Sequence, residues 1–194
     1  MRVFILLVIT VFVLTSFKKT GVNNNNIKKQ SAPELYVKRF YKTAIEESIL
    51  FGIPASITLA QGILESNSGR SRMVLRERNH FGIKCSSITI KTCKCANYND
   101  DSPSDMFRVF KTDWESYREH SKLLSTDRYK HLKKIPAREY KRWTKGLLRA
   151  GYATNQKYDK ILNNIIEVYH LRKYDNWYYR YLIKIELRKK LIIK

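Results

Sequence analysis

Glu65 stands near the end of an apolar stretch, "LAQGILESNSGRS", which covers residues 59–71. The spacing of its apolar residues predicts a buried helix that ends at Gly69. The last turn of a helix disfavours a carboxylate anion, and the flanking Ile63 and Leu64 would partly remove water from it. Both effects raise the pKa of a carboxyl group, and a protonated carboxylic acid can donate its proton to a glycosidic oxygen. The alternative interpretation is a Glu on the exposed side of a surface helix.

Three further segments follow the Glu65 helix in a set order. The helix reads "ASITLAQGILESNSGRS", and the later segments read "NHFGIKC", "FRVFKTDWESYREHSKLL" and "RWTKGLLRAGYATNQKYDKIL". Together they resemble the glucosaminidase domain of glycoside hydrolase family 73, most of all its exported forms in Bacteroidetes-type bacteria and more distantly the flagellar-rod peptidoglycan hydrolases. The resemblance implies a mainly α (α+β), lysozyme-like helical domain with a small β-lobe over the cleft. It also implies cleavage of the β-1,4 bond after N-acetylglucosamine in peptidoglycan.

The same resemblance suggests roles for individual residues. Glu65 matches the general acid of the family. The segment that lines the cleft after the catalytic helix corresponds to Asn79, His80, Phe81 and Gly82. The family motif whose Tyr lies beside the sugar corresponds to Tyr152, Ala153 and Thr154. Where the family continues with Asp-Pro, this chain has Asn155 and Gln156, which puts one side-chain contact near the cleft in doubt. Read on its own, His80 fits a cleft wall and a hydrogen-bonded core residue equally well.

The second catalytic group is expected in the β-lobe, where many family members carry a Glu that is proposed to activate water. The corresponding stretch, "CKCANYNDDSPSDMF", contains no Glu, so Asp101 and next Asp100 are the candidates. The alternative for both is ordinary turn chemistry before Pro103. If both carboxylates lie far from Glu65, the substrate's own N-acetyl group is the remaining nucleophile. Tyr98, just before this pair, is a candidate sugar-stacking ring.

The chain that must position these residues divides into four parts. We expect a signal peptide or anchor at residues 1–17, a linker at 18–31, the catalytic domain at 32–174 and a basic aromatic tail at 175–194. Helical spacing predicts helices that begin near residues 32, 54, 112, 136 and 158. A small hairpin or β-lobe is expected within residues 86–110. The tail pattern fits a strand and a helix equally well.

Two local signals refine the helices. Ser31 with Glu34, and Thr112 with Glu115, fit the capping-box pattern that begins a helix. Three aromatic residues on the later helices lie at core spacing, which favours packing over a sugar-binding role: Trp114, Tyr117 and Trp143.

Charge and the N-terminal sequence bear on location and partners. The chain has 194 residues, with 38 Lys and Arg against 17 Asp and Glu, and a formal net charge of +21. Such a balance predicts an anionic partner. The apolar run at residues 3–17 suits a signal-peptide core, with an uncleaved anchor as the alternative. Export to the periplasm or cell envelope excludes most nucleic-acid roles and leaves peptidoglycan glycan strands, with the basic tail available for an anionic envelope surface.

The three cysteines, Cys85, Cys93 and Cys95, predict one disulfide with one free thiol, or three thiols. Their C-x-C spacing is not the usual zinc-ligand pair, so we expect no metal and no cofactor. We also expect a monomer. The sequence therefore predicts an endo-β-N-acetylglucosaminidase. A lytic transglycosylase and a non-catalytic, cationic wall-binding protein are the alternatives.

Overall fold

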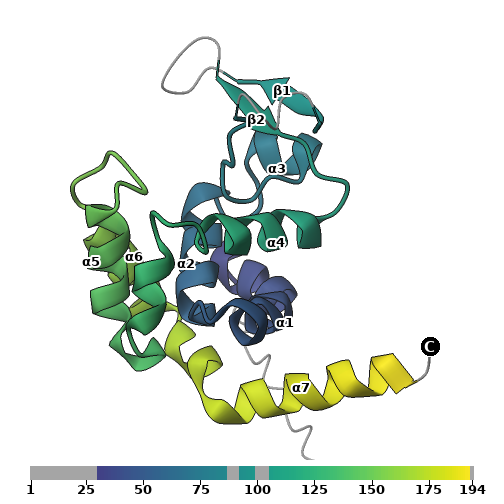
Figure 1. The fold of residues 1–194 in the computed structure, drawn as a ribbon, viewed down its shortest axis with the longest axis vertical. Helices are drawn as coiled ribbons and strands as arrows, with labels where there is room; N and C mark the ends of the chain where they lie inside the picture. Colours follow the sequence, from purple (N-terminus) through teal and green to yellow (C-terminus); the bar gives the residue numbers. More distant parts are fainter. Residues whose placement is uncertain (1–29, 87–91, 99–104, 193–194) are drawn as a thin grey trace, which may run out of the picture.

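The computed structural model describes residues 30–86, 92–98 and 105–192 (Figure 1). The predicted signal peptide or anchor, most of the predicted linker, and both Asp100 and Asp101 lie outside the described residues. The described elements are α1 (Ala32–Phe51), α2 (Ala55–Glu65), α3 (Arg72–Glu77), β1 (Cys95–Asn97), β2 (Met106–Arg108), α4 (Asp113–Leu123), α5 (Tyr140–Arg149), α6 (Tyr158–Val168) and α7 (Trp177–Ile192). Short 3₁₀ turns are η2 (Lys130–Lys134), η3 (Ala137–Glu139) and η4 (Leu171–Asp175). The predicted fold class, a mainly helical domain with one small hairpin, is confirmed.

Helix α2 forms the centre of the core, and α1, α6 and η4 pack around it. Every side chain from Ala55 to Ile63 is buried, so this helix has no solvent face until its last two residues. Asp175 of η4 accepts the backbone N–H of Ser56 at 3.0 Å, which satisfies one free donor of the first turn. Burial raises the pKa of Asp175 to about 6. Because the helix is fixed at its start and along its length, its last turn is held in place.

The predicted helix starts agree with the structure at both capping sites. Ser31 and Glu34 form a complete capping box at the start of α1, with the Glu34 carboxylate accepting the Ser31 backbone N–H at 2.6 Å. At the start of α4, the Thr112 hydroxyl accepts the Glu115 backbone N–H at 3.1 Å. Of the three aromatic residues expected in the core, Tyr117 and Trp143 are buried.

Two predictions for the helices differ from the structure. Helix α2 ends at Glu65 rather than at Gly69, because Asn67, Ser68 and Gly69 take left-handed φ values of 48°, 57° and 76°. Trp114 is 45% exposed instead of buried, and the Arg118 guanidinium lies 4.6 Å from its ring centre.

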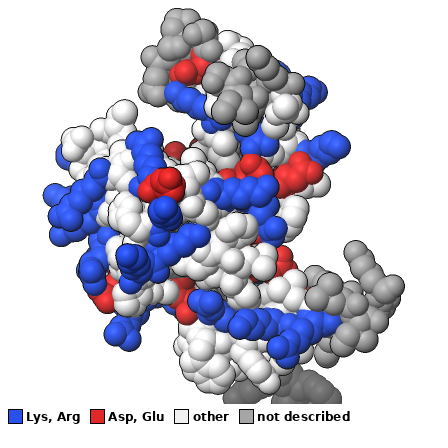
Figure 2. Space-filling model, in the orientation of Figure 1, with Lys and Arg blue, Asp and Glu red and all other residues white. Residues whose placement is uncertain are grey.

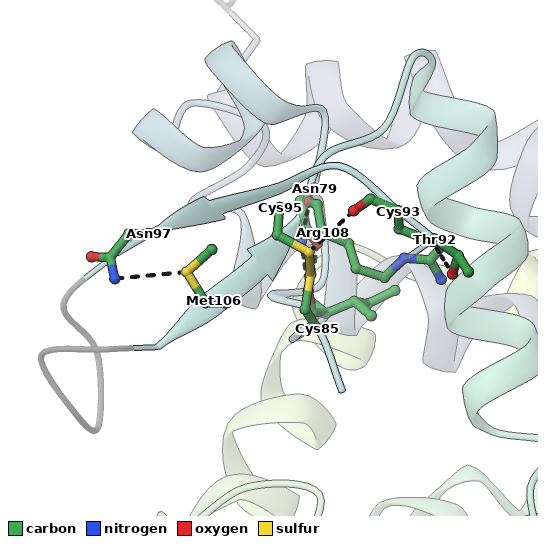
Figure 3. Close-up of a disulfide and its surroundings, with 9 residues drawn as sticks. Asn79, Cys85, Thr92, Cys93, Cys95, Asn97, Met106 and Arg108 are labelled. Atoms are coloured by element: carbon green, nitrogen blue, oxygen red, sulfur yellow. Dashed lines mark hydrogen bonds between the residues drawn. A yellow bond between two sulfur atoms is a disulfide. The ribbon is translucent and has the colours of Figure 1, made fainter. Parts of the chain in front are cut away.

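A small two-stranded antiparallel hairpin, β1 with β2, stands above the helices, and α3 lies beside it (Figure 1). A disulfide joins Cys85 to Cys95 of β1, and Cys93 is a free thiol (Figure 3). This matches the first of the two expected cysteine states. The guanidinium of Arg108 on β2 contacts the Cys93 sulfur at 3.4 Å and also pairs with Glu119 of α4, which ties the hairpin to the helical body.

The basic aromatic tail, whose pattern fitted a strand and a helix, forms helix α7, which packs on α1. Ile183 is the most buried of residues 177–188, at 4% exposure, and Lys42 of α1 pairs with Glu186 at 2.9 Å. Nowhere in the described residues does a helix reach the length and apolar character needed to cross a bilayer.

Candidate active site

Glu65 is the last residue of α2, and its side chain is exposed. The sequence argument expected Ile63 and Leu64 to desolvate the carboxyl group, but Ile63 points into the core and leaves Glu65 at the surface. Directly after it, the buried Ser66 hydroxyl accepts the Gly69 backbone N–H at 2.7 Å and bonds the Gly62 carbonyl. This tight turn fixes the last turn of the helix, while the carboxyl group stays open to an incoming molecule.

A buried chain of hydrogen bonds ends on Glu65. The Tyr158 hydroxyl donates to Glu65 Oε1 at 2.8 Å, and Gln61 Nε2 donates to the Tyr158 hydroxyl at 3.1 Å. Behind them, His120 Nε2 and Gln61 Oε1 are 3.1 Å apart. Gln61 and Glu65 are four residues apart on α2, so they share one face of that helix. We call these four residues the Glu65 relay.

His120 fixes the direction of the Glu65 relay. The residue is completely buried, and burial lowers its pKa to about 3, so its ring is neutral and carries one N–H. With that N–H donated to Gln61 Oε1, the Gln61 amide must present its NH₂ group to Tyr158. The Tyr158 hydroxyl then donates its own proton to Glu65. Burial raises the pKa of Tyr158 above the ordinary value of a Tyr, so the hydroxyl keeps that proton. Each donor in the relay therefore points toward Glu65.

Tyr152 lies against the Glu65 relay. Its ring stacks on that of Tyr158 with centres 5.6 Å apart and meets the rings of His120 and Tyr129 edge-on. Burial, and then the charge of Glu65, raises the pKa of Tyr152 well above its ordinary value. Within the described part of the chain, its buried hydroxyl has no hydrogen-bond partner. The structure thus brings Tyr152 and Glu65 together and leaves Tyr152 with a donor to offer.

The rest of the Tyr152 motif, which reads "GYAT" at residues 151–154, forms the loop between α5 and α6. Ala153 is half-buried and Thr154 is exposed. Arg128 holds the start of this loop, since its guanidinium donates to the carbonyls of Ala150, at 2.6 Å, and Gly151. Gly151 has a φ of 68°, which a residue without a Cβ adopts at little cost.

The replacement after this motif preserves a local contact. The Asn155 side-chain oxygen accepts the Lys157 backbone N–H at 2.8 Å, and its carbonyl accepts the Tyr158 backbone N–H at 3.0 Å. A carboxylate at residue 155 would accept the same Lys157 bond, so Asn here keeps the turn that begins α6.

The "NHF" segment lies in the core rather than on an open surface. Asn79, His80 and Phe81 are 1%, 1% and 4% exposed. The Asn79 amide donates to the carbonyls of Ile83 and Arg108 at 3.0 Å, and its oxygen accepts the Ile83 N–H at 3.0 Å. Asn79 therefore clamps strand β2 to this turn (Figure 3). These side chains were expected to line the cleft. In the structure they are buried instead, where Asn79 forms hydrogen bonds to the backbone and Phe81 packs in the core.

His80 belongs to a second buried network, which packs against Gly62 of α2 through Tyr36. Its Nδ1 lies 3.0 Å from the Tyr36 hydroxyl, which accepts a bond from Tyr117 at 2.8 Å. Its Nε2 lies 3.1 Å from Asp113 Oδ1, and this bond holds the pKa of Asp113 below its ordinary value. Of the two interpretations of His80, the structure supports the hydrogen-bonded core residue.

The network places Tyr36 directly under the last turns of α2. A Cβ at Gly62 would overlap the Tyr36 hydroxyl and lie 3.0 Å from its Cε1. We expect Gly62→Ala to destabilise the fold by about 1–3 kcal/mol through overpacking, measured by chemical denaturation. The Tyr36→Phe background removes the overlapping hydroxyl, so the same substitution should cost clearly less there. An equal cost in both backgrounds would contradict this packing account.

Tyr98 turns toward α3. Its hydroxyl donates to Glu77 at 3.3 Å, and the Arg72 guanidinium lies 5.9 Å from its ring centre. Burial, and then the charge of Glu77, raises its pKa. A sugar-stacking role for Tyr98 stays a prediction, as do the roles of Asp100 and Asp101. No group of three or more His, Cys, Asp or Glu side chains that could hold a metal ion occurs among the residues described.

Sequence reasoning missed three residues of the Glu65 relay as parts of the site: Gln61, His120 and Tyr158. A signal was present, because a buried Gln on an apolar helix needs hydrogen-bond partners, and Gln61 lies one helical turn before Glu65.

Comparison with known proteins bears on the family and the fold. The sequence pattern of one family, mannosyl-glycoprotein endo-beta-N-acetylglucosaminidase, matches residues 41–171. Exo-glucosaminidase LytG of Bacillus subtilis (strain 168) is 32% identical over 128 residues, which are 62% of this chain and 45% of LytG. The chain therefore spans less than half the length of this curated relative.

Two solved structures share the fold. The catalytic domain of the autolysin Auto from Listeria monocytogenes superposes with a TM-score of 0.63 and 26% identity, over 75% of this chain and 89% of that one. The glycoside hydrolase domain of FlgJ from Salmonella typhimurium gives a TM-score of 0.56 and 26% identity, over 70% and 86% of the two chains. With a family match over most of its length and an exposed Glu at the end of its central helix, the chain belongs to the glucosaminidase family.

Proposed function

We propose that the protein is a peptidoglycan hydrolase that cleaves the β-1,4 bond after N-acetylglucosamine, with Glu65 as the general acid. The observation that carries this proposal is the placement of Glu65. Its carboxyl group is accessible at the end of a rigid helix, and the buried Tyr158 hydroxyl donates to one of its oxygens. The protonated Glu65 carboxyl group gives its proton to the glycosidic oxygen as the bond to the sugar C1 breaks.

Tyr152 is proposed to help position the sugar on the N-acetylglucosamine side of the cleaved bond. Its hydroxyl is buried beside Glu65 and lacks a hydrogen-bond partner among the described residues. Sugar binding would have to expose this hydroxyl, and a substrate acceptor would then recover the free energy that a buried donor without a partner costs. Ala153 and Thr154 follow on the same loop and are proposed to contact the glycan strand.

The second half of the reaction adds water to C1. Asp101, or else Asp100, would take a proton from that water. If neither reaches the site, the acetamido oxygen of the substrate attacks C1 and forms a cyclic intermediate, which water then opens while the Glu65 carboxylate accepts the proton. Both routes give the same hydrolysed bond. They differ in the configuration at C1, which NMR of fresh product records.

We further propose that the protein is exported and acts in the periplasm or cell envelope, as do Bacteroidetes-type forms in the resemblance described above. The apolar run at residues 3–17 and the net charge of +21 support this location. Expression with a C-terminal reporter enzyme that is active only after export tests it. Export should fail when charged residues interrupt the apolar run, and unchanged export of that variant would contradict the proposal.

The bond that is cut is tested by digestion of purified sacculi and mass spectrometry of the products. We expect reducing N-acetylglucosamine ends. Reducing N-acetylmuramic acid ends, or the 1,6-anhydro ends of a lytic transglycosylase, would contradict the assignment. Product length separates two modes of cutting, because an endo enzyme releases mixed oligosaccharides at early times and an exo enzyme releases only terminal units.

A further inference from the structure

Helix α7 carries a concentration of exposed aromatic and aliphatic side chains. Nine large hydrophobic residues are exposed in the described part of the chain, and four of them lie between residues 177 and 182. Their exposed fractions are 73% for Trp177, 51% for Tyr178, 56% for Tyr181 and 43% for Leu182. A cluster of exposed apolar side chains on a protein surface indicates an interaction site.

The inner face of α7 explains why this cluster stays outside. Tyr179 packs on Tyr174, with ring centres 5.5 Å apart, and Ile183 is buried against the core. The ion pair of Lys42 with Glu186 fastens the same side to α1. At 3.6 residues per turn, residues 179, 183 and 186 lie on the inner side, and residues 177 and 181 lie on the opposite side. Together with the exposed flank of residues 178 and 182, they form the outward face. The helix cannot rotate to bury the aromatic cluster without breaking these contacts.

One edge of the outward face is basic. Lys184 and Arg188 are exposed and continue the row that begins with Trp177 and Tyr181, while the half-buried Arg180 lies beside it. Figure 2 shows Lys and Arg side chains along α7 next to uncharged surface. The one acidic residue of this helix, Glu186, lies on the inner side in its pair with Lys42. The outward face is therefore aromatic and positively charged.

We propose that the outward face of α7 is a docking surface for an anionic lipid bilayer. Trp and Tyr rings favour the headgroup region, where their apolar bodies and polar tips are both satisfied. Lys and Arg at the edge of such a face attract anionic headgroups. The helix lies on the bilayer and does not cross it, in keeping with the described helices, none of which could span a membrane.

The position of α7 in the fold suits this contact. The helix lies at the opposite end of the molecule from the hairpin β1–β2 and extends beyond the helical body (Figure 1). A bilayer against α7 would leave the hairpin and the end of α2 facing away from the lipid. The docking surface does not depend on the proposed glycosidase activity, because none of its residues belongs to the Glu65 relay.

Trp177 provides a local probe in the full chain. The chain has three Trp residues, and Trp143 is buried, so Trp114→Phe leaves Trp177 as the exposed indole. We expect its emission to shift to shorter wavelength, and to be quenched by brominated lipid, when vesicles of phosphatidylcholine with phosphatidylglycerol are added. Pure phosphatidylcholine vesicles should give a much smaller shift. This readout reports contact at α7 itself, whatever the apolar run at residues 3–17 does.

Charge variants complete the test. Lys184→Ser with Arg188→Ser should reduce the shift on anionic vesicles to the level seen on phosphatidylcholine, whereas Lys134→Ser with Arg138→Ser, which removes the same charge at exposed sites elsewhere, should leave it intact. Circular dichroism checks that both variants fold. An equal shift on both vesicle types would overturn the proposal. So would a shift caused by sacculi but not vesicles, or one that rises with protein concentration without lipid, which would indicate a second copy.

Discussion

Glu65→Gln is expected to lower the rate of peptidoglycan cleavage by about a hundredfold to ten-thousandfold, the range that a positioned general acid contributes. Glutamine keeps the size of the side chain and still accepts the bond from Tyr158, but it has no proton to give to the leaving oxygen. Because Glu65 is exposed, the substitution should leave the melting temperature almost unchanged. Release of soluble muropeptides from purified sacculi measures the rate, and differential scanning fluorimetry measures the stability.

The chain contains a close match for Glu65 that serves as the control. Glu167 is also exposed, lies in the last turn of α6, and accepts a hydrogen bond from a buried Tyr hydroxyl, that of Tyr140, at 2.6 Å. It stands at the opposite end of α6 from Tyr158. Glu167→Gln makes the same chemical change at an exposed Glu that a Tyr hydroxyl contacts. It also removes the ion pair of Glu167 with Lys141 at 3.2 Å, and we expect wild-type cleavage from it. Equal activities of the two variants would show that Glu65 is not the acid.

The same pair of variants distinguishes the non-catalytic alternative. A cationic wall-binding protein would sediment with sacculi and release no muropeptides even as the wild type. If the protein is a hydrolase, the Glu65→Gln variant should still sediment with sacculi. The substitution raises the formal net charge by one and removes only the proton donor. Binding that persists while cleavage is lost therefore assigns Glu65 to the chemistry and not to attachment.

Local signals in the sequence predicted helices that correspond to α1, α2, α4, α5 and α6, but not the short helix α3. The capping box of Ser31 and Glu34 depends on residues three apart, so it can be recognised without tertiary structure. Glu65 could be singled out because its position relative to the helix end is also a local property. The end of α2 was missed by four residues, since Asn67 and Ser68 adopt left-handed conformations that residue type alone does not require.

Contacts between distant segments decided what the sequence could not. His120, Gln61 and Tyr158 come from three helices, and their relay exists only after α4, α2 and α6 have packed. Burial of the "NHF" segment likewise depends on the bonds of Asn79 to Arg108, 29 residues away. The tail pattern was ambiguous because its helical form is chosen by packing of Ile183 on the core, a tertiary effect that overrides local preference.

The relay itself is tested by Tyr158→Phe, which removes one hydroxyl and keeps the ring. In the wild type, a hydrogen bond donated to the carboxylate stabilises the anion. A general acid works only while protonated, so activity falls as pH rises through the titration of that acid. Without the Tyr158 donor the neutral acid persists to higher pH. We therefore expect the alkaline limb of the pH–rate profile to move to higher pH by about one pH unit. This shift corresponds to the low end of the free energies of hydrogen bonds to charged groups, because Glu65 is partly solvated.

The same variant should also lower the maximal rate by about tenfold, because Glu65 Oε1 loses the contact that orients it and one hydrogen bond is worth about that factor. The buried Gln61 amide loses its acceptor, so the free energy of unfolding should fall by about 1–3 kcal/mol. Tyr140→Phe is the matched control: it removes the donor to Glu167 and should leave the pH profile in place. If Tyr158→Phe lost stability with the alkaline limb unmoved, Tyr158 would be a packing residue. A limb displaced upward in Tyr158→Phe alone would show that the buried relay acts on the acid, through a bond that joins α6 to the end of α2.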